Sequence, residues 1–87
     1  MFIITLRLVG PADAYVEAEE VRALLSTHFE PADQIEHLWV HSQAGRIDVA
    51  LFVLADGEAD ALLTSRAAYQ RITSHLPNLA PWRLSDS

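Results

Sequence analysis

The stretch that decides the fold is IEHLWVHSQAGRIDVALFVL, residues 35–54. Its two halves are rich in β-branched and aromatic side chains, which are typical of strands, and Ala44-Gly45 between them suits a two-residue hairpin turn. A turn at that point pairs Gln43 with Arg46 and fixes every later pair along the hairpin. A shift of one residue would exchange the two faces of a strand, so the register decides which side chains share a face.

The predicted register gives the hairpin two faces of different character. One face holds the pairs Ser42–Ile47, Val40–Val49 and Leu38–Leu51, and the other holds the pairs His41–Asp48, Trp39–Ala50 and His37–Phe52. The first face is almost wholly apolar, so we expect helices to cover it. The second carries imidazole, indole and carboxylate groups, so we expect it to lie on the side of the sheet without helices.

Before the hairpin, the sequence predicts a strand and then a helix. Residues 2–9, FIITLRLV, alternate in the manner of a strand and end at Gly10-Pro11. Asp13 suits the N-cap of the helix, because its carboxylate can accept hydrogen bonds from the free amides of the next turn. Apolar residues at helical spacing predict the buried stripe of this helix: Ala14, Ala18, Val21, Leu24, Leu25 and Phe29.

After the hairpin, the sequence predicts a second helix and a short last strand. Asp56 suits the N-cap of the helix, Pro77 ends it, and residues 82–84 form the strand. His28 and His75 each fall in the last turn of a predicted helix, where an imidazole can bind free carbonyl groups. The expected buried stripe of the second helix is Ala61, Leu62, Ser65, Ala68, Tyr69, Ile72 and Leu76.

The resulting order of elements, βαββαβ, predicts the fold class. We expect an α+β domain of the ferredoxin-like plait type, with a four-stranded antiparallel sheet and two helices on one face. Right-handed crossovers place the first and third strands in the middle of such a sheet and the second and fourth at its edges. At 87 residues, the chain is long enough for one domain, so residues 1–87 are expected to form a single unit.

The composition excludes several classes of function. The chain has no cysteine and no lysine, which rules out thiolate metal sites, cysteine nucleophiles and Schiff-base chemistry. Twelve acids against six arginines give a formal charge of −6, and the arginines are scattered singly along the chain. Nucleic-acid binding depends on clustered basic residues, so we expect no nucleic-acid partner, and nothing in the pattern indicates a cofactor.

The apolar segments are too short for a membrane protein. The longest apolar stretch, residues 49–55, falls far below the length that crosses a bilayer. The first residues carry no positive charge ahead of their apolar run, which is unlike a secretory signal. We therefore expect a cytoplasmic protein with no membrane contact.

The sheet side without helices is the candidate functional surface. It is expected to hold His37, Trp39, His41, Asp48, Phe52 and Leu54, with Ile3, Thr5 and Arg7 from the neighbouring strand. A bare sheet face in a small domain is normally polar, so the apolar groups here indicate that something covers it. We expect a homodimer formed through the sheet, in a non-catalytic accessory or regulatory protein that binds a protein partner or a small molecule.

An alternative interpretation is a small dimeric α/β-barrel enzyme with a cavity at the sheet face. In that case His41 and Asp48, with His37, would transfer protons, because a carboxylate that orients an imidazole is half of a general-base arrangement. A metal held by His37 and His41 is not expected, because residues four apart on a strand are separated by about 13 Å. Arg7, on a central strand, needs a partner, and Asp48 or a ligand carboxylate can serve.

Overall fold

The computed structural model describes residues 1–85 and gives four strands, two α-helices and two short 3₁₀ turns. In chain order they are β1 (Phe2–Val9), α1 (Ala18–His28), η1 (Pro31–Asp33), β2 (Ile35–Gln43), β3 (Arg46–Val53), α2 (Glu58–Thr73), η2 (Pro77–Leu79) and β4 (Arg83–Leu84). Neither helix in this part of the chain combines the length and the apolar character needed to cross a bilayer.

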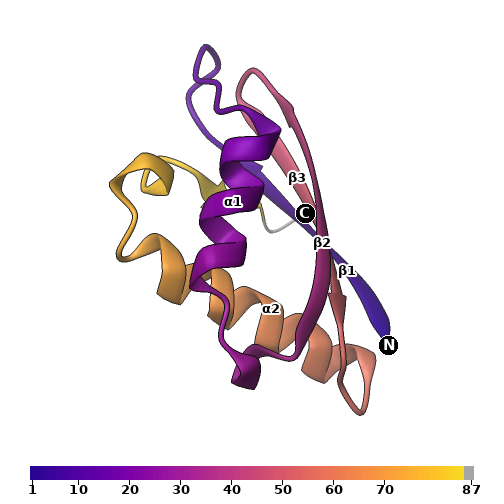
Figure 1. Ribbon diagram of the computed structural model, residues 1–87. Helices are drawn as coiled ribbons and strands as arrows, with labels where there is room; N and C mark the ends of the chain where they lie inside the picture. Colours follow the sequence, from indigo (N-terminus) through magenta and orange to yellow (C-terminus); the bar gives the residue numbers. More distant parts are fainter. Residues whose placement is uncertain (86–87) are drawn as a thin grey trace.

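The strands form one antiparallel sheet in the order β2-β3-β1-β4. The first and third strands therefore lie in the middle, as the sequence predicts, and the chain belongs to the α+β class. Figure 1 shows α1 and α2 on the same side of this sheet, which leaves its other side uncovered.

The register of the hairpin is the predicted one at every pair from Gln43–Arg46 to His37–Phe52. Beyond His37 the ladder shifts, and Ile35 lies opposite Val53. Glu36 is thus an extra residue in β2, and a bulge of this kind bends the strand locally. The interruption lies beyond the pairs that define the two faces, so both predicted faces survive.

The core lies between the sheet and the two helices. Alternate residues of β1 and β3 point toward the helices, and Leu38 joins them from β2. The buried apolar residues are Ile4, Leu6, Leu8, Val21, Leu25, Leu38, Ile47, Val49, Leu51, Val53, Ala61, Ala68, Tyr69, Ile72, Leu79 and Trp82. Phe2 and Val40 also lie on the helix side, half-buried against this core, and the strand residues that alternate with this set face away from both helices.

The first helix begins later than the sequence predicts. α1 starts at Ala18 with Glu17 at its N-cap position, so the expectation that Asp13 caps it is wrong. The backbone of Ala14 explains the delay, because its N–H donates to Pro11 O at 2.9 Å and its carbonyl accepts from the N–H of Gly45 at 2.8 Å. These bonds belong to a turn and to the hairpin tip, and they are incompatible with an early helical turn.

The second helix also differs in detail. Gly57 occupies the N-cap position in place of Asp56, and Leu62, expected in the buried stripe, is 39% exposed. Ser65 does lie in the stripe, where its hydroxyl donates to Ala61 O at 2.8 Å. His75 falls just beyond the end of α2 and is exposed, so the expected cap is absent there. His28 Nδ1 does bond to Leu24 O at 2.8 Å, as predicted.

The tip of the β2–β3 hairpin is joined to the loop that follows β1. Gly10 N–H donates to Gly45 O at 3.1 Å, and Gly45 N–H donates to Ala14 O. Gly45 has a φ of 76°, in the left-handed region, and a Cβ there would lie 3.2 Å from the Cα of Ala12. Glycine is therefore needed at this turn both for its backbone conformation and for the close approach of the loop.

Candidate functional site

The candidate site is the side of the sheet that faces away from the helices, which we call the open face. Three strands supply its residues: Ile3, Thr5, Arg7 and Val9 from β1, His37, Trp39 and His41 from β2, and Arg46, Asp48, Ala50 and Phe52 from β3. Trp39 is 65% exposed and Ile3 is 63% exposed. The structure thus brings together the residues that the sequence placed on this surface, with Leu54 exposed just after β3.

The open face is arranged in rows that run across the strands. His37, Phe52 and Ile3 lie side by side in one row, and Trp39, Ala50 and Thr5 lie in the next. Continuing toward the hairpin tip, His41, Asp48 and Arg7 form the third row, followed by Arg46 and Val9. The first two rows are mainly apolar and aromatic, and we call them the apolar end.

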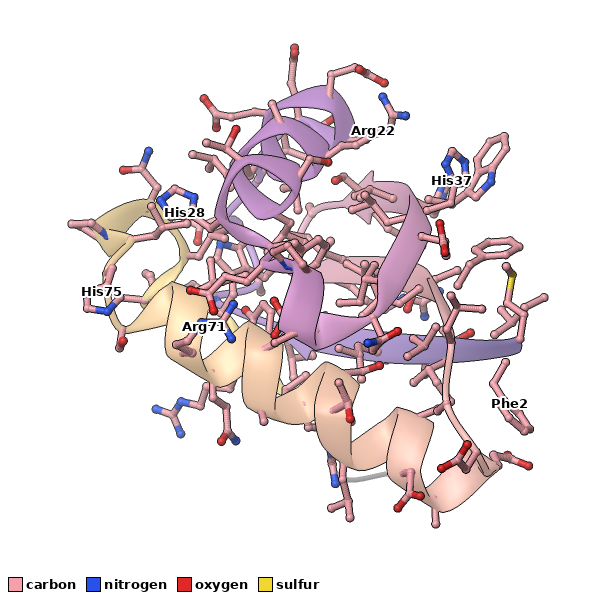
Figure 2. The ribbon with its side chains drawn as sticks, turned by 60° about the horizontal axis from the view of Figure 1, so that its bottom comes forward. Phe2, Arg22, His28, His37, Arg71 and His75 are labelled. Atoms are coloured by element: carbon pink, nitrogen blue, oxygen red, sulfur yellow. The ribbon has the colours of Figure 1, made fainter. Side chains whose placement is uncertain are left out.

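The apolar end contains a small aromatic cluster. The ring of His37 lies edge-on to Trp39, with centroids 6.2 Å apart, and edge-on to Phe52, with centroids 5.6 Å apart. Figure 2 shows His37 pointing outward from the sheet. Edge-to-face contacts at these distances are the favoured arrangement of aromatic rings, so His37 helps to hold the exposed indole in place.

Asp48 is held by two arginines and not by His41. The Arg7 Nε donates to Asp48 Oδ1 at 3.1 Å, and the Arg46 Nε and Nη2 both lie 3.2 Å from Asp48 Oδ2. The predicted Arg7–Asp48 pair is confirmed. His41 lies directly opposite Asp48 in the ladder, but no hydrogen bond joins them within residues 1–85. The carboxylate here orients guanidinium groups, and no acidic side chain among the described residues orients the imidazole.

Metal-binding side chains do not cluster in the described part of the chain. Among residues 1–85, no three histidine, aspartate or glutamate side chains lie close enough together to hold an ion. His37 and His41 share a face of β2, with Trp39 between them.

A half-buried ionic cluster joins α2 to the turn at Pro31–Asp33, and the sequence patterns do not indicate it. Arg71 on α2 binds both oxygens of Asp33 at 2.8 Å and also donates to His28 O at 3.3 Å. Asp33 Oδ2 accepts a further bond from the N–H of Glu30 at 2.8 Å. The hydrogen bonds from Arg71 lower the pKa of Asp33, although burial opposes them, and they raise the pKa of Arg71.

This cluster lies on the helix side, away from the open face, and it joins three parts of the chain. Figure 2 shows Arg71 between α2 and the end of α1 that carries His28. The EPAD sequence at residues 30–33 signals the local turn, because Pro31 favours a helical start and Asp33 can cap it. No local sequence pattern relates Asp33 to Arg71, so the sequence does not predict that these two residues form an ion pair.

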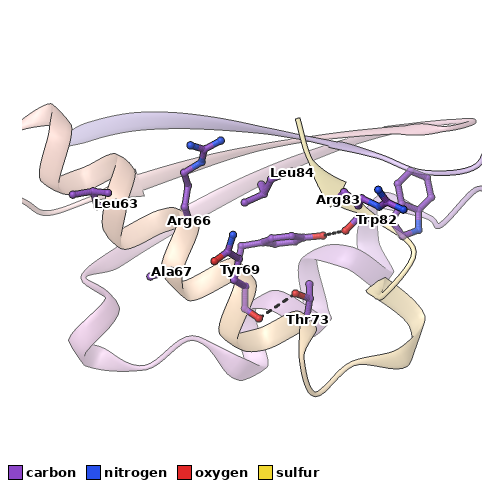
Figure 3. Close-up of a pocket in the computed structure, with 9 residues that line it drawn as sticks. Leu63, Arg66, Ala67, Tyr69, Thr73, Trp82, Arg83 and Leu84 are labelled. Carbon is purple, nitrogen blue, oxygen red and sulfur yellow. Dashed lines mark hydrogen bonds between the residues drawn. The ribbon is translucent and has the colours of Figure 1, made fainter. Parts of the chain in front are cut away.

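A second feature that the sequence does not indicate is a groove of about 600 Å³ between α2 and residues 82–84. Figure 3 shows Tyr69 spanning it, with its hydroxyl donating to Trp82 O at 3.0 Å. Burial raises the pKa of Tyr69. The hydroxyl satisfies a buried carbonyl group, so its role here is to fix the segment that leads into β4.

Comparison with known proteins adds no family. Protein-family models, curated proteins and solved structures give no match to this chain. The function is therefore argued from the geometry of the open face.

Proposed function

We propose that this chain is a ferredoxin-like plait and a non-catalytic accessory or regulatory protein that forms a homodimer through its open face. The observation that carries the proposal is the exposure of Trp39 and Ile3, with Phe52 and Ala50 half-buried between them. An apolar patch of this kind on a small domain marks an interaction surface. The strand order β2-β3-β1-β4 with both helices on one side supports the fold assignment.

A second copy of the chain suits this surface in size. A stable interface buries about 800 Å² on each partner, out of the 5282 Å² that this chain exposes. One face of a two-layer domain can supply that area. A domain of this length also has a small core, so the burial of an aromatic residue against a second copy adds stability that the monomer lacks.

Charge favours contact between the two apolar ends. In an isologous dimer each copy offers the same patch to the other. The rows that contain Arg7 and Arg46 would repel their own copies if they were packed face to face. Packing of Trp39, Phe52 and Ile3 against the same residues of the second copy avoids that repulsion, with the basic rows at the ends of the contact.

The enzyme interpretation receives less support. Proton transfer by His41 would need Asp48 as an orienting acceptor, and both oxygens of Asp48 bond to arginines. Among residues 1–85, the ring contacts of His37 are with Trp39 and Phe52, neither of which is a nucleophile. The same residues serve better as an interface, because aromatic rings are the usual anchors of protein contacts.

The test is the molar mass in solution by light scattering, combined with analytical ultracentrifugation of variants. Trp39→Ala should weaken association by about 30-fold, the effect of removing an interface anchor. Leu63→Ala is the matched control, because Leu63 is 67% exposed but lies on α2. A monomer at high concentration, or equal association of wild type and Trp39→Ala, would contradict the proposal.

A further inference from the structure

Three arginines gather at one end of the open face, although the chain as a whole is acidic. Arg7 and Arg46 flank Asp48, and Arg83 lies opposite Val9 in the ladder, next to Arg46 across β1. Val9 and Arg83 also line one groove of about 490 Å³. We call Arg7, Arg46 and Arg83 with Asp48 the basic end. These four side chains carry two positive charges in excess, while the chain carries −6.

The basic end has hydrogen-bond donors left for a ligand. A guanidinium group has five N–H donors in a fixed fork. The bonds to Asp48 use the Nε of Arg7 and the Nε and Nη2 of Arg46. Within residues 1–85 no other acceptor bonds to the Nη groups of Arg7, and its side chain is 48% exposed. Asp48 therefore orients the two arginines without using all of their donors.

Two short side chains, Ala50 and Thr5, lie between the basic end and the row that contains Phe52. The row that begins at Trp39 continues through Ala50 to Thr5; Arg7 follows Thr5 along β1 on the basic side, and Phe52 follows Ala50 along β3 on the other side. Packed sheets lie about 10 Å apart, and protein interiors leave few voids of molecular size. A second sheet over this row would leave space above Ala50 and Thr5. Arg7 would border that space next to Thr5, and the indole of Trp39 would border it next to Ala50.

We propose that the open face binds a small organic carboxylate with an aromatic or branched apolar body. The carboxylate accepts hydrogen bonds from Arg7 and neighbouring arginines, because the guanidinium fork matches its two oxygens. The apolar body lies over Ala50 and Thr5 against Trp39. This inference deepens the proposed function and rests on it for the second sheet that closes over the ligand.

The excess charge explains why the ligand is an anion. Arg7 adjoins Thr5 at the border of the covered rows, so a second copy would remove part of the water from its guanidinium group, which is costly unless an opposite charge compensates. Among residues 1–85, Asp48 is the acidic side chain that bonds to the basic end, and its single charge compensates only part of the charge of the three arginines. A bound carboxylate supplies the missing charge, and its apolar body fills the space over the short side chains at the same time.

The experiment uses naphthalene-2-carboxylate as the probe and naphthalene-2-carboxamide as its neutral match. Isothermal titration of the wild-type protein should give tighter binding of the carboxylate by about tenfold or more, the value expected for a charged hydrogen-bonded pair. Arg7→Gln should lose most of this preference. Gln70→Glu, on the exposed surface of α2, changes the net charge of the chain by the same single unit and should retain it. Inorganic phosphate, which has no apolar body, should bind at least tenfold more weakly than the naphthoate.

Each result separates this inference from the proposed dimer, because light scattering gives the mass of the same samples. A dimer that binds the carboxylate and the carboxamide equally overturns the anion site and leaves the dimer in place. The anion site is also overturned if the Arg7→Gln dimer binds the carboxylate as tightly as the wild type does. It is overturned as well if phosphate binds as tightly as the naphthoate. A chain that stays monomeric overturns the proposed function, and the closed site with it.

Discussion

Replacing Arg71 with methionine tests how much the buried ionic cluster contributes to stability. The wild-type guanidinium bonds to both oxygens of Asp33, whose side chain is 8% exposed. Methionine keeps much of the apolar stem of arginine but removes the charge and all of its donors. The N–H of Glu30 is then the only remaining partner of the Asp33 carboxylate among the described bonds.

The size of the effect follows from the burial of the two partners. Removing one partner from a fully buried ion pair costs about 3–5 kcal/mol, because the other charge is left without compensation. Here the Arg71 side chain is 37% exposed, so water reaches the site and screens the charges. We therefore expect Arg71→Met to lower the free energy of unfolding by about 2 kcal/mol at neutral pH.

The assay is urea unfolding at one protein concentration, monitored by fluorescence. Arg22→Met is the exposed control, and we expect it to change the free energy of unfolding by less than about 0.5 kcal/mol.

The pKa of Asp33 is lower in the folded protein than in the unfolded chain. Its contribution is therefore present above the unfolded pKa of about 3.9 and is lost as the pH falls through the folded value. The difference between wild type and Arg71→Met should shrink below about pH 4.

Two results would refute this reasoning. The first is a loss in Arg71→Met no larger than that of the exposed control. The second is a loss that stays constant down to pH 3, since Asp33 takes up a proton below about pH 3.9 in the unfolded chain and only at a lower pH when it is bound to Arg71. The double variant Asp33→Asn with Arg71→Met should be more stable than Arg71→Met alone, because asparagine keeps an acceptor for the Glu30 N–H and buries no charge.

Two further substitutions test the features that hold the ends of the strands. Tyr69→Phe should lower the free energy of unfolding by about 1 kcal/mol, because it removes the hydroxyl that donates to the carbonyl of Trp82, and urea unfolding measures this directly. An unchanged unfolding curve would mean that water replaces the bond. Gly45→Ala should cost about 1–2 kcal/mol in thermal or urea unfolding, because its positive φ is unfavourable for alanine and the new Cβ would press on Ala12. Gly57→Ala is its control, since a Cβ there meets nothing within 4 Å; equal losses in the two variants would contradict the argument from the turn.

The hairpin was predictable because its constraint is local. A two-residue turn at Ala44-Gly45 leaves one register in which apolar residues share a face, and that register is the observed one. The strand order followed from the sequence of elements and the handedness of crossovers. Most of the open face could therefore be assigned before any coordinates, including the pair between Arg7 and Asp48.

The features that escaped prediction depend on contacts between distant parts of the chain. The start of α1 is set by the backbone bonds of Ala14, which donates to Pro11 O and accepts from Gly45 N–H, and these bonds override the capping tendency of Asp13. The partner of Asp33 lies on α2, and the partner of the Tyr69 hydroxyl is a backbone carbonyl that carries no sequence signal. The sequence also showed the arginines as scattered, whereas strand pairing gathers Arg7, Arg46 and Arg83.

The bonds between the hairpin tip and the loop after β1 have a consequence for the evolution of this chain. Hairpin turns usually tolerate inserted residues, because both ends of the turn lie at the surface. Here Gly45 accepts a bond from Gly10 and donates one to Ala14, so lengthening the turn would pull the hairpin tip away from the loop that follows β1. Relatives with extra sequence should carry it near Gly57, where the backbone has open space around it.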